Sequence, residues 1–359
     1  MLTKNKRIVF FDGTLMQGGA ERVISILSRH LSERGFSVQI LLLYDREIFY
    51  EIAPSVRVTV VEKESGSKNL LKNLLWVRRF FEKNADVVIS FLAQFNMFAL
   101  VAHTGLKSKI IVADRNDPRH MPNRQYLRKL RNLLYRFADG VVVQTSHNKE
   151  YFSKDVQKKS IVIHNPVDLG DLAGKAIGAE KKREIVSVGR LMPQKNQSML
   201  LEAFAAIRDE FPDYVLTIYG EGPERSNLER KADELGIGDR VFLPGSVKDV
   251  HDRIISSELF VLSSDYEGMP NALIEAMCLG LPCISTKVSG ATDLIRDGEN
   301  GLLIEVGDCD EMKGALRQML LNEELRERSG KQAVLLNDAL ETEKITAQWI
   351  EAVESVIDQ

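Results

Sequence analysis

The segment from Glu267 to Glu275 places two carboxylates eight residues apart around the start of a predicted helix. It follows the apolar run Leu259–Leu262, so the order is strand, loop and helix. Pro270 suits the first helical position because its missing N–H would be unpaired there anyway. A helix N-terminus attracts an anion, whereas carboxylates accept hydrogen bonds from sugar hydroxyls. The pattern indicates a site for a phosphorylated sugar.

Two cations follow another buried strand. The run Ile185–Val188 leads into Gly189, Arg190 and, five residues beyond Arg190, Lys195. Glycine lets the backbone turn close to a ligand, and two cations on one loop can converge on a diphosphate. The alternative is a pair of ordinary solvated surface cations.

Three further turns carry glycine where a strand gives way to the next element. Gly18 and Gly19 precede a helix and could approach a phosphate, although no Walker or dinucleotide fingerprint surrounds them. Gly222 lies in Gly-Glu-Gly-Pro, which predicts a turn into a helix and could form the floor of a nucleotide pocket. Backbone groups of Val247 and Lys248, after the following strand, could pair with a base edge.

The elements that position these residues alternate between strand and helix. Continuous apolar strands separated by helices indicate a parallel sheet covered on both faces. The strands expected in the first half are 8–11, 36–44, 56–61, 87–91, 110–113 and 141–143. The second half restarts the pattern, with strands expected at 185–188, 215–219, 241–243, 259–262, 283–285 and 302–304.

The predicted fold is therefore α/β, with two doubly wound, Rossmann-like domains that face a central cleft. We expect residues 1–167 to form the first domain and 168–339 the second, beginning with a polar linker at 168–183. Residues 340–359 are predicted to form a terminal helix with one buried stripe, which includes Ile345 and Trp349. Ligands of such sheets bind beyond the carboxyl ends of the strands.

Charge is distributed unevenly along the chain. Residues 1–167 carry 27 Lys and Arg against 15 Asp and Glu, a net charge of +12, and the remainder carries 21 against 36, a net charge of −15. A basic half could meet anionic lipid, a pyrophosphate acceptor or nucleic acid, or the two domains could simply attract each other. Nucleic acid fits less well because no aromatic platform accompanies the cations.

Nothing in the sequence predicts a signal peptide or a membrane span. Cys278, Cys283 and Cys309 lack metal-binding spacing and are expected to be reduced thiols in a cytoplasmic protein. The Asp308-Cys309-Asp310 stretch precedes a helix and is better explained by helix capping than by a metal ion. We expect neither a metal nor a cofactor.

In this order, Gly18-Gly19, Gly189-Arg190 with Lys195, Gly220-Glu-Gly222-Pro223 and Glu267 with Glu275 resemble the family 4 retaining glycosyltransferases of the GT-B fold. The resemblance covers nearly the whole chain. It implies that Arg190 and Lys195 neutralise the donor diphosphate and that Glu275 holds the ribose. It further implies that Glu267 and the loop of Gly268, Met269, Pro270 and Asn271 contact the donor sugar. The resemblance also implies that the last helix packs on the first domain.

One position departs from the family pattern. Many members place a histidine near the sugar and the acceptor where this chain has Arg115, within the acceptor-side stretch Asp114, Arg115 and Asn116. Arginine cannot act as a general base at neutral pH, but it can stabilise anionic charge or orient an acceptor. We therefore place Arg115 with Arg190, Lys195 and Glu267 among the predicted catalytic residues. The alternative is an ion pair of Arg115 with Asp114 or Asp117.

A basic, amphipathic helix is predicted over residues 123–137. Its apolar side chains are Tyr126, Leu127, Leu130, Leu133, Leu134 and Phe137, and its cations are Arg124, Arg128, Lys129, Arg131 and Arg136. The ordinary interpretation puts the apolar face in the core and the basic face in water. The alternative is peripheral docking on an anionic membrane.

These features predict a hexosyltransferase that retains anomeric configuration. It would move a hexose or N-acetylhexosamine from a nucleotide diphosphate sugar, taken to be UDP-linked by resemblance, to a glycan or polyprenyl-diphosphate-linked saccharide. Such a reaction belongs to the assembly of bacterial surface polysaccharides. Two alternatives are a noncatalytic sugar-nucleotide-binding partner of another transferase and a sugar-nucleotide epimerase.

Overall fold

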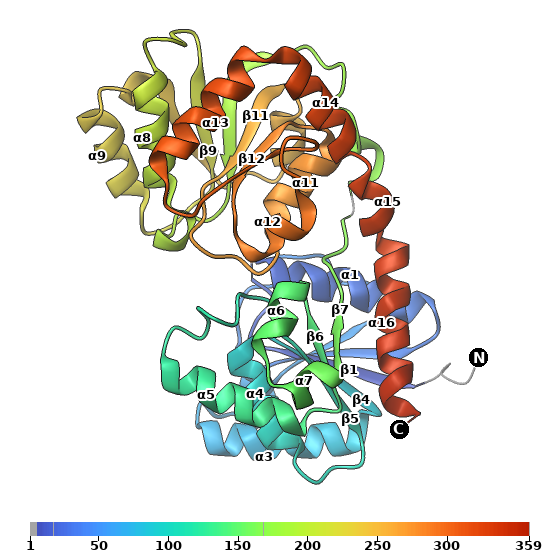
Figure 1. Cartoon of the computed structure of the whole chain (residues 1–359). Helices are drawn as coiled ribbons and strands as arrows, with labels where there is room; N and C mark the ends of the chain where they lie inside the picture. Colours follow the sequence, from blue (N-terminus) through green and yellow to red (C-terminus); the bar gives the residue numbers. More distant parts are fainter. Residues whose placement is uncertain (1–5, 17, 168, 359) are drawn as a thin grey trace. The chain divides into compact units, whose positions relative to one another are not determined.

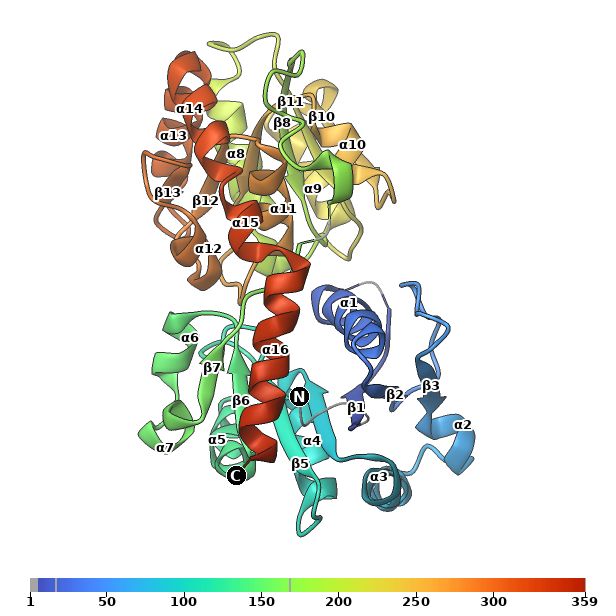
Figure 2. The same cartoon turned by 90° about the vertical axis from the view of Figure 1, so that its right-hand side faces the viewer.

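The computed structural model describes residues 6–16, 18–167 and 169–358. The chain divides into two compact units, Met1–Pro166 with Leu340–Gln359, and Val167–Ala339. The predicted boundary lies one residue later. Each unit is an α/β layer structure around one parallel sheet (Figures 1 and 2).

The first unit contains a seven-stranded sheet in the order β3-β2-β1-β4-β5-β6-β7. Its strands are β1 (Arg7–Asp12), β2 (Ser37–Leu42), β3 (Arg57–Val60), β4 (Val87–Phe91), β5 (Lys109–Ala113), β6 (Gly140–Val143) and β7 (Ser160–Val162). The strand predictions missed β7, which has only three residues and lies at the sheet edge. Its helices are α1 (Gly19–Glu33), α2 (Val61–Ser65), α3 (Leu70–Asn84), α4 (Ala93–His103), α5 (Gln125–Leu134), α6 (Ser146–Tyr151), α7 (Lys154–Lys158) and α16 (Thr342–Ile357).

Both faces of this sheet are buried, because alternate side chains of each strand enter different cores. Ile8 and Phe10 of β1 pack with side chains of α1 and α16, whereas Val9 and Phe11 pack with those of α3 and α4. The terminal helix α16 lies along the sheet beside α1, as both ribbon views show (Figures 1 and 2). Its Trp349 is fully buried and stacks on Phe91 of β4, with ring centroids 5.7 Å apart.

The second unit contains a six-stranded parallel sheet in the order β10-β9-β8-β11-β12-β13. Its strands are β8 (Lys182–Val188), β9 (Val215–Tyr219), β10 (Val241–Gly245), β11 (Ser257–Leu262), β12 (Cys283–Thr286) and β13 (Leu302–Ile304). Its helices are α8 (Gln197–Ile207), α9 (Arg225–Glu234), α10 (Val250–Ile254), α11 (Asn271–Leu279), α12 (Ser289–Leu294), α13 (Cys309–Leu321), α14 (Glu323–Ala333) and α15 (Leu336–Leu340), which ends at the first residue of the returning segment.

The strand order of the second unit reverses between β8 and β11. From β8 the chain moves outward to β9 and β10, and it then returns to place β11 on the other side of β8. Loops that leave the carboxyl ends of two such strands turn to opposite faces of the sheet, which opens a crevice between them. The loop after β8 carries the two predicted cations, and the loop after β11 carries Glu267 and leads into α11, which carries Glu275.

Candidate functional site

The loops after β8 and β11 are held together by hydrogen bonds at the carboxyl edge of the sheet. Ser263 Oγ donates to the Lys195 carbonyl at 2.9 Å, and the Asp265 amide donates to the Gln194 carbonyl at 2.9 Å. Asn196 Nδ2 donates to Asp265 Oδ1 at 2.8 Å. The backbone that carries Lys195 is therefore fixed relative to the backbone that carries Glu267, although the two residues lie 72 positions apart.

Lys195 and Glu267 form an ion pair that is largely buried. Lys195 Nζ lies 2.5 Å from Glu267 Oε1, and the two side chains are 17% and 10% exposed. Ser264 Oγ donates to the same Glu267 oxygen at 2.7 Å. The structure thus brings together the predicted diphosphate cation and the predicted sugar-binding carboxylate.

Arg190 is the second cation of this edge. Its residue is exposed, and its guanidinium makes no hydrogen bond or ion pair with any residue that the structure describes. A Cβ on Gly189 would lie only 3.5 Å from Lys195 Cε, so the loop brings the backbone before Arg190 close to the lysine. The exposed Arg190 guanidinium is therefore available to bind an anion.

The loop Gly268–Asn271 lies between Glu267 and α11. The helix starts at Asn271, one residue later than predicted, and Pro270 is its N-cap with an extended backbone. Gly268, Met269 and Pro270 are buried, whereas Asn271 is half-buried. The burial of Gly268, Met269 and Pro270 therefore fixes the loop next to the Lys195–Glu267 pair.

A glycine that the sequence reasoning missed supports this loop. Gly290 begins the first turn of α12, and a Cβ there would lie 2.6 Å from the Gly268 carbonyl oxygen and 2.6 Å from Pro270 Cδ. Only a residue without a side chain allows α12 to pack against the loop. A glycine four residues beyond the end of β12 was the one sequence signal for it.

Glu275 lies within α11, is buried, and bonds to a histidine from another helix. His251 Nε2 of α10 lies 2.9 Å from Glu275 Oε2. Because an ionised carboxylate only accepts hydrogen bonds, Nε2 is the ring nitrogen that carries the hydrogen. Sequence reasoning did not select His251, although it is the one histidine between residues 167 and 339.

The glycines after β9 pack against the loop after β8. A Cβ on Gly220 would lie 1.9 Å from the Gly189 carbonyl oxygen, and one on Gly222 would lie 2.2 Å from that of Leu191. Their absent side chains therefore let two loops of the same edge approach. Val247 is half-buried and Lys248 exposed on the loop between β10 and α10.

In the first unit, Gly18 and Gly19 stand at the start of α1. Gly18 is the N-cap, and its N–H donates to Tyr50 Oη at 3.2 Å, while that hydroxyl donates to the Gly18 carbonyl at 2.9 Å. The Tyr50 ring thereby fixes the glycine turn at the carboxyl edge of β1.

Arg115 follows β5 and is 7% exposed. Its Nη2 donates to Asn165 Oδ1, which also accepts from Gln144 Nε2 at 2.9 Å. Its guanidinium lies over the Phe91 ring, 5.6 Å from the centroid, and Nε and Nη1 have no hydrogen-bond partner among the described residues. Burial lowers the pKa of Arg115 to about 9, which leaves the side chain charged at neutral pH.

The alternative pairing of Arg115 with Asp114 or Asp117 is wrong. Asp114 accepts from Tyr135 Oη at 3.2 Å and lies 3.7 Å from Arg131 Nη1, whereas Asp117 accepts from His120 Nδ1 at 2.9 Å. Burial raises the pKa of Asp114, and the charge of Arg131 opposes that rise. Each carboxylate has another partner because the turn after β5 points Arg115 toward β6 and the end of β7.

Asp12 ends β1 and was not selected from the sequence. Its side chain is buried, Oδ1 accepts from the Gly13 amide at 2.6 Å, and Oδ2 has no partner among the described residues. Burial, helped by the negative charge of Glu21, raises the pKa of Asp12 well above its usual range. A polar group with spare hydrogen-bonding capacity thus lies at the same edge as Gly18.

The ordinary interpretation of the basic helix holds only in part for α5. Leu127 and Leu134 are half-buried, and Leu134 packs against the core. The rest of the apolar stripe, formed by Tyr126, Leu130, Leu133 and, just after the helix, Phe137, is 58%, 43%, 52% and 72% accessible. The fully buried residue of α5 is a cation, Arg131, which donates to the Met121 carbonyl at 2.5 Å and the Pro118 carbonyl at 2.9 Å.

Three aromatic rings enclose the Arg131 guanidinium. The centroids of Tyr135, Tyr151 and Phe152 lie 6.0, 5.3 and 5.2 Å from its Cζ. The helix therefore fastens the loop 114–122 through its one buried cation and leaves Leu130 and Leu133 exposed. Apolar patterning alone could not distinguish this mixed arrangement from an ordinary core helix.

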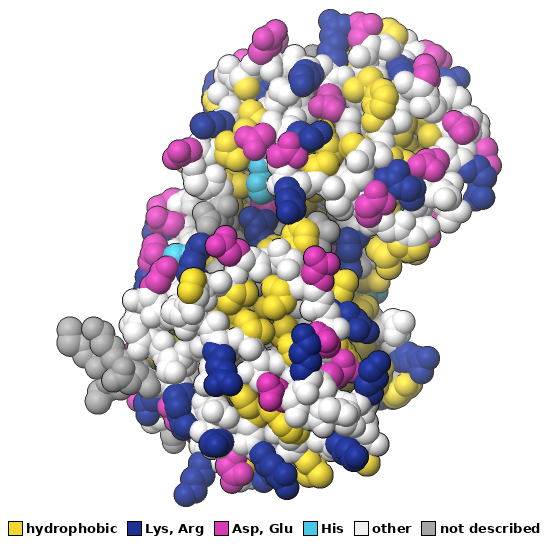
Figure 3. Space-filling model, turned by 180° about the vertical axis from the view of Figure 1, so that it is seen from behind, with side chains coloured by type: hydrophobic (Ala, Val, Ile, Leu, Met, Phe, Trp, Pro, Cys, Tyr) yellow, Lys and Arg dark blue, Asp and Glu magenta, His cyan; other side chains and the backbone are white. Residues whose placement is uncertain are grey.

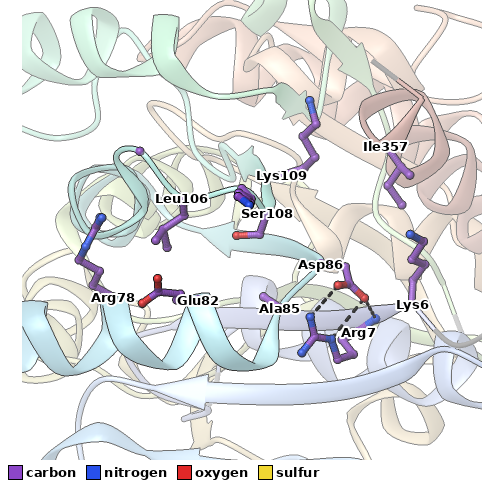
Figure 4. Close-up of a pocket in the computed structure, with 12 residues that line it drawn as sticks. Lys6, Arg7, Arg78, Glu82, Ala85, Asp86, Leu106, Ser108, Lys109 and Ile357 are labelled. Carbon is purple, nitrogen blue, oxygen red and sulfur yellow. Dashed lines mark hydrogen bonds and ion pairs between the residues drawn. The ribbon is translucent and has the colours of Figure 1, made fainter.

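Two pockets lie at the opposite, amino-terminal edges of the sheets. One of about 640 Å³ adjoins the starts of β1, β4 and β5 (Figure 4), where Arg7 Nη2 donates to Asp86 Oδ1 at 2.7 Å. The other, of about 650 Å³, includes the Glu258–Arg326 ion pair at 2.7 Å. Their main charges are already paired, and ligands of these sheets bind at the other edge.

Asp308 accepts from the Glu311 amide at 2.9 Å and caps α13. Within residues 6–16, 18–167 and 169–358, no three His, Cys, Asp or Glu side chains gather as a metal site would require. Among the same residues, no helix has the length and apolar character needed to cross a bilayer.

Comparison with known proteins places this geometry in a family. A family model described as "Glycosyltransferase Family 4" matches residues 17–171, and one described as "Glycosyl transferases group 1" matches residues 174–335. The chain is 30% identical over 341 residues to the N-acetylgalactosamine-N,N'-diacetylbacillosaminyl-diphospho-undecaprenol 4-alpha-N-acetylgalactosaminyltransferase of Campylobacter jejuni, with 89% of this chain and 92% of that protein covered. The chain belongs to the family 4 glycosyltransferases.

Another Campylobacter jejuni relative is 29% identical over 98% of this chain and 99% of its own length. It is the GalNAc-alpha-(1->4)-GalNAc-alpha-(1->3)-diNAcBac-PP-undecaprenol alpha-1,4-N-acetyl-D-galactosaminyltransferase. The fold of this family 4 glycosyltransferase matches that of Anabaena HepE, crystallised with UDP and glucose, at a TM-score of 0.84 and 20% identity, covering 98% of this chain and 100% of HepE. These findings confirm the predicted family, the GT-B fold and the enzyme class.

Replacing Gly290 with alanine will displace the Gly268–Asn271 loop, because the new Cβ would overlap backbone atoms that have no room to move freely. We expect the variant to fold and to bind a nucleotide diphosphate sugar about tenfold more weakly, as measured by calorimetry. Gly314→Ala is the matched control, since a Cβ there meets nothing within 4 Å on α13. Equal affinity of the two variants would contradict this role for Gly290.

Proposed function

We propose that this family 4 glycosyltransferase retains anomeric configuration and uses a UDP-linked hexose or N-acetylhexosamine as donor. Its acceptor would be a hydroxyl of a glycan or polyprenyl-diphosphate-linked saccharide in bacterial surface-polysaccharide assembly. The observation that carries the proposal is the Lys195–Glu267 ion pair between the loops after β8 and β11, with Arg190 on the same loop as Lys195. The acceptor class is supported by the names of the two Campylobacter jejuni relatives, and the uridine base by the HepE complex.

In the proposed donor site, Arg190 and Lys195 balance the charge of the diphosphate as it leaves. Glu267 and the backbone of the Gly268–Asn271 loop bind hydroxyls of the sugar, and Glu275 binds those of the ribose. Backbone groups of Val247 and Lys248 pair with the base, while Gly222 forms the floor beneath it. The two cations supply the positive charge, so the proposal requires no metal ion or cofactor.

Retention requires no enzyme nucleophile in this proposal. The departing phosphate oxygen takes the proton of the attacking acceptor hydroxyl, and the same face of the sugar carbon that loses the phosphate gains the new bond. Neither Glu267 nor Glu275 then acts as an acid or a base. The Lys195–Glu267 ion pair supports this assignment because the carboxylate is already engaged by an ammonium group.

The first unit is proposed to bind the acceptor at the stretch Asp114 to Asn116, whereas Gly18 and Gly19 are proposed to take part in binding the donor. Arg115 would act there as a fixed positive charge that stabilises negative charge developing nearby. Because Arg115 is buried, water screens its charge poorly. We therefore propose that Arg115 acts on the acceptor by long-range electrostatic attraction and not by direct contact.

The family match favours a transferase over the two alternatives, a noncatalytic binding partner and an epimerase. A thermal-shift screen should show stabilisation of about 2.7 kcal/mol by a donor at one hundred times its dissociation constant. We expect UDP sugars to give the largest shift, and NMR of the product should show the anomeric configuration of the donor. An inverted product would contradict retention, and release of an altered free sugar nucleotide would favour the epimerase.

Arg190→Ala should lower kcat by a factor of about 10² to 10³, because the leaving diphosphate loses one of its two charge partners. Arg183→Ala is the matched control. Arg183 lies at the start of β8, the strand that precedes Arg190, and pairs with Asp213 on the surface. Initial rates with saturating donor provide the measurement. Full turnover by a folded Arg190→Ala protein would overturn the assignment of the diphosphate site.

We further propose that the exposed stripe of α5 rests on an anionic membrane at the cytoplasmic face, where lipid-linked acceptors would be presented. Lys129 and Arg136 flank the stripe and are exposed. Other exposed leucines of the first unit, Leu71 and Leu75 of α3, are likewise accompanied by cations, and Figure 3 shows Lys and Arg interspersed with apolar side chains on one face of this unit.

Flotation with vesicles tests this membrane contact. The wild-type protein should float with phosphatidylglycerol-containing vesicles and much less with neutral ones, since each basic residue near such a surface contributes about 1 kcal/mol. The double variant Leu130→Asn, Leu133→Asn should lose this binding and keep its turnover on a soluble acceptor. The control Leu321→Asn, Leu335→Asn changes leucines that are 66% and 63% exposed in the second unit. Equal flotation with neutral and anionic vesicles would contradict the proposal.

A further inference from the structure

His251 stands between two parts of the proposed donor site. It lies four residues after Val247 and three after Lys248, on the helix that follows the proposed base-binding loop. That helix, α10, packs against α11, which carries Glu275. The bond from His251 Nε2 to Glu275 Oε2, at 2.9 Å, joins the base-binding segment to the ribose-binding carboxylate.

We propose that His251 is a positioning residue that orients Glu275 for the ribose hydroxyls of the donor. The inference rests on the proposed function, and it adds a residue and a role that the family pattern of two glutamates does not contain. The proposed ligand contact remains that of Glu275, since His251 acts through its hydrogen bond to the carboxylate.

The geometry favours this role over simple surface pairing. The side chains of His251 and Glu275 are 20% and 12% exposed, so the bond is shielded from water. A glutamate side chain has three rotatable bonds, and holding it in one rotamer before the ligand arrives removes part of the entropy loss of binding. The imidazole takes one of about four acceptor positions of the carboxylate.

The short connection through α10 has a consequence for specificity. Asp249, the N-cap of α10, pairs with Arg253 at 3.0 Å across the turn that carries His251. A displacement of the Val247–Lys248 loop would therefore move the imidazole and, with it, the Glu275 carboxylate. A nucleotide whose base does not fit the loop loses affinity at the ribose as well as at the base.

The test compares UDP with its 2′,3′-dideoxy analogue on the full chain by calorimetry. His251→Ala should weaken UDP binding about tenfold, the scale of one hydrogen bond to a charged group, and leave binding of the dideoxy analogue unchanged. His251→Gln, whose amide nitrogen can occupy the place of Nε2, should restore most of the UDP affinity. In a Glu275→Gln background the His251→Ala change should have little further effect, because the two residues act as one unit.

The outcomes separate this inference from the proposed function. A wild-type protein that binds no nucleoside diphosphate would overturn both. Strong UDP binding that His251→Ala leaves unchanged would overturn the role of His251 alone, and so would an equal loss for UDP and the dideoxy analogue. Thermal unfolding of each variant identifies loss of fold, and the Gln variant keeps the question decidable if the Ala variant unfolds.

Discussion

The reversal of strand order between β8 and β11 is the constraint on which the proposed donor site depends. It brings the ends of two strands side by side and sends their loops to opposite faces of the sheet. Lys195 and Glu267 can then form an ion pair although they are far apart in sequence. The hydrogen bonds between the two loops hold that pair in place, and the glycines after β9 allow a third loop to approach the same edge.

Around this edge, small residues and buried polar groups set the position of each functional side chain. Gly290 lets α12 support the sugar-side loop, and His251 connects the base-side loop to Glu275. In the first unit, Arg131 holds the loop 114–122 in place, because its enclosed guanidinium donates hydrogen bonds to two backbone carbonyls of that loop.

The residues of the proposed site that could be selected from the sequence were those that follow a strong local pattern. Arg190, Lys195, Glu267 and Glu275 each stand at a fixed distance from a buried apolar strand, and a parallel sheet places such residues at one edge. His251, Gly290 and Asp12 could not be predicted in this way, because their roles come from neighbours in other elements. The three-residue strand β7 was missed because so short a run carries no usable periodicity.

The sequence by itself determined the two parallel sheets and the family, because these depend on local hydrophobic pattern and on motif order. Only the tertiary structure decided which neighbours each polar side chain contacts and which side chains are buried. Arg115 binds Asn165 and lies over Phe91, and neither neighbouring aspartate pairs with it. On α5 the fold buries Arg131 and exposes Leu130 and Leu133. Burial and pairing depend on the neighbours that a residue meets after folding, and a one-dimensional pattern contains no record of them.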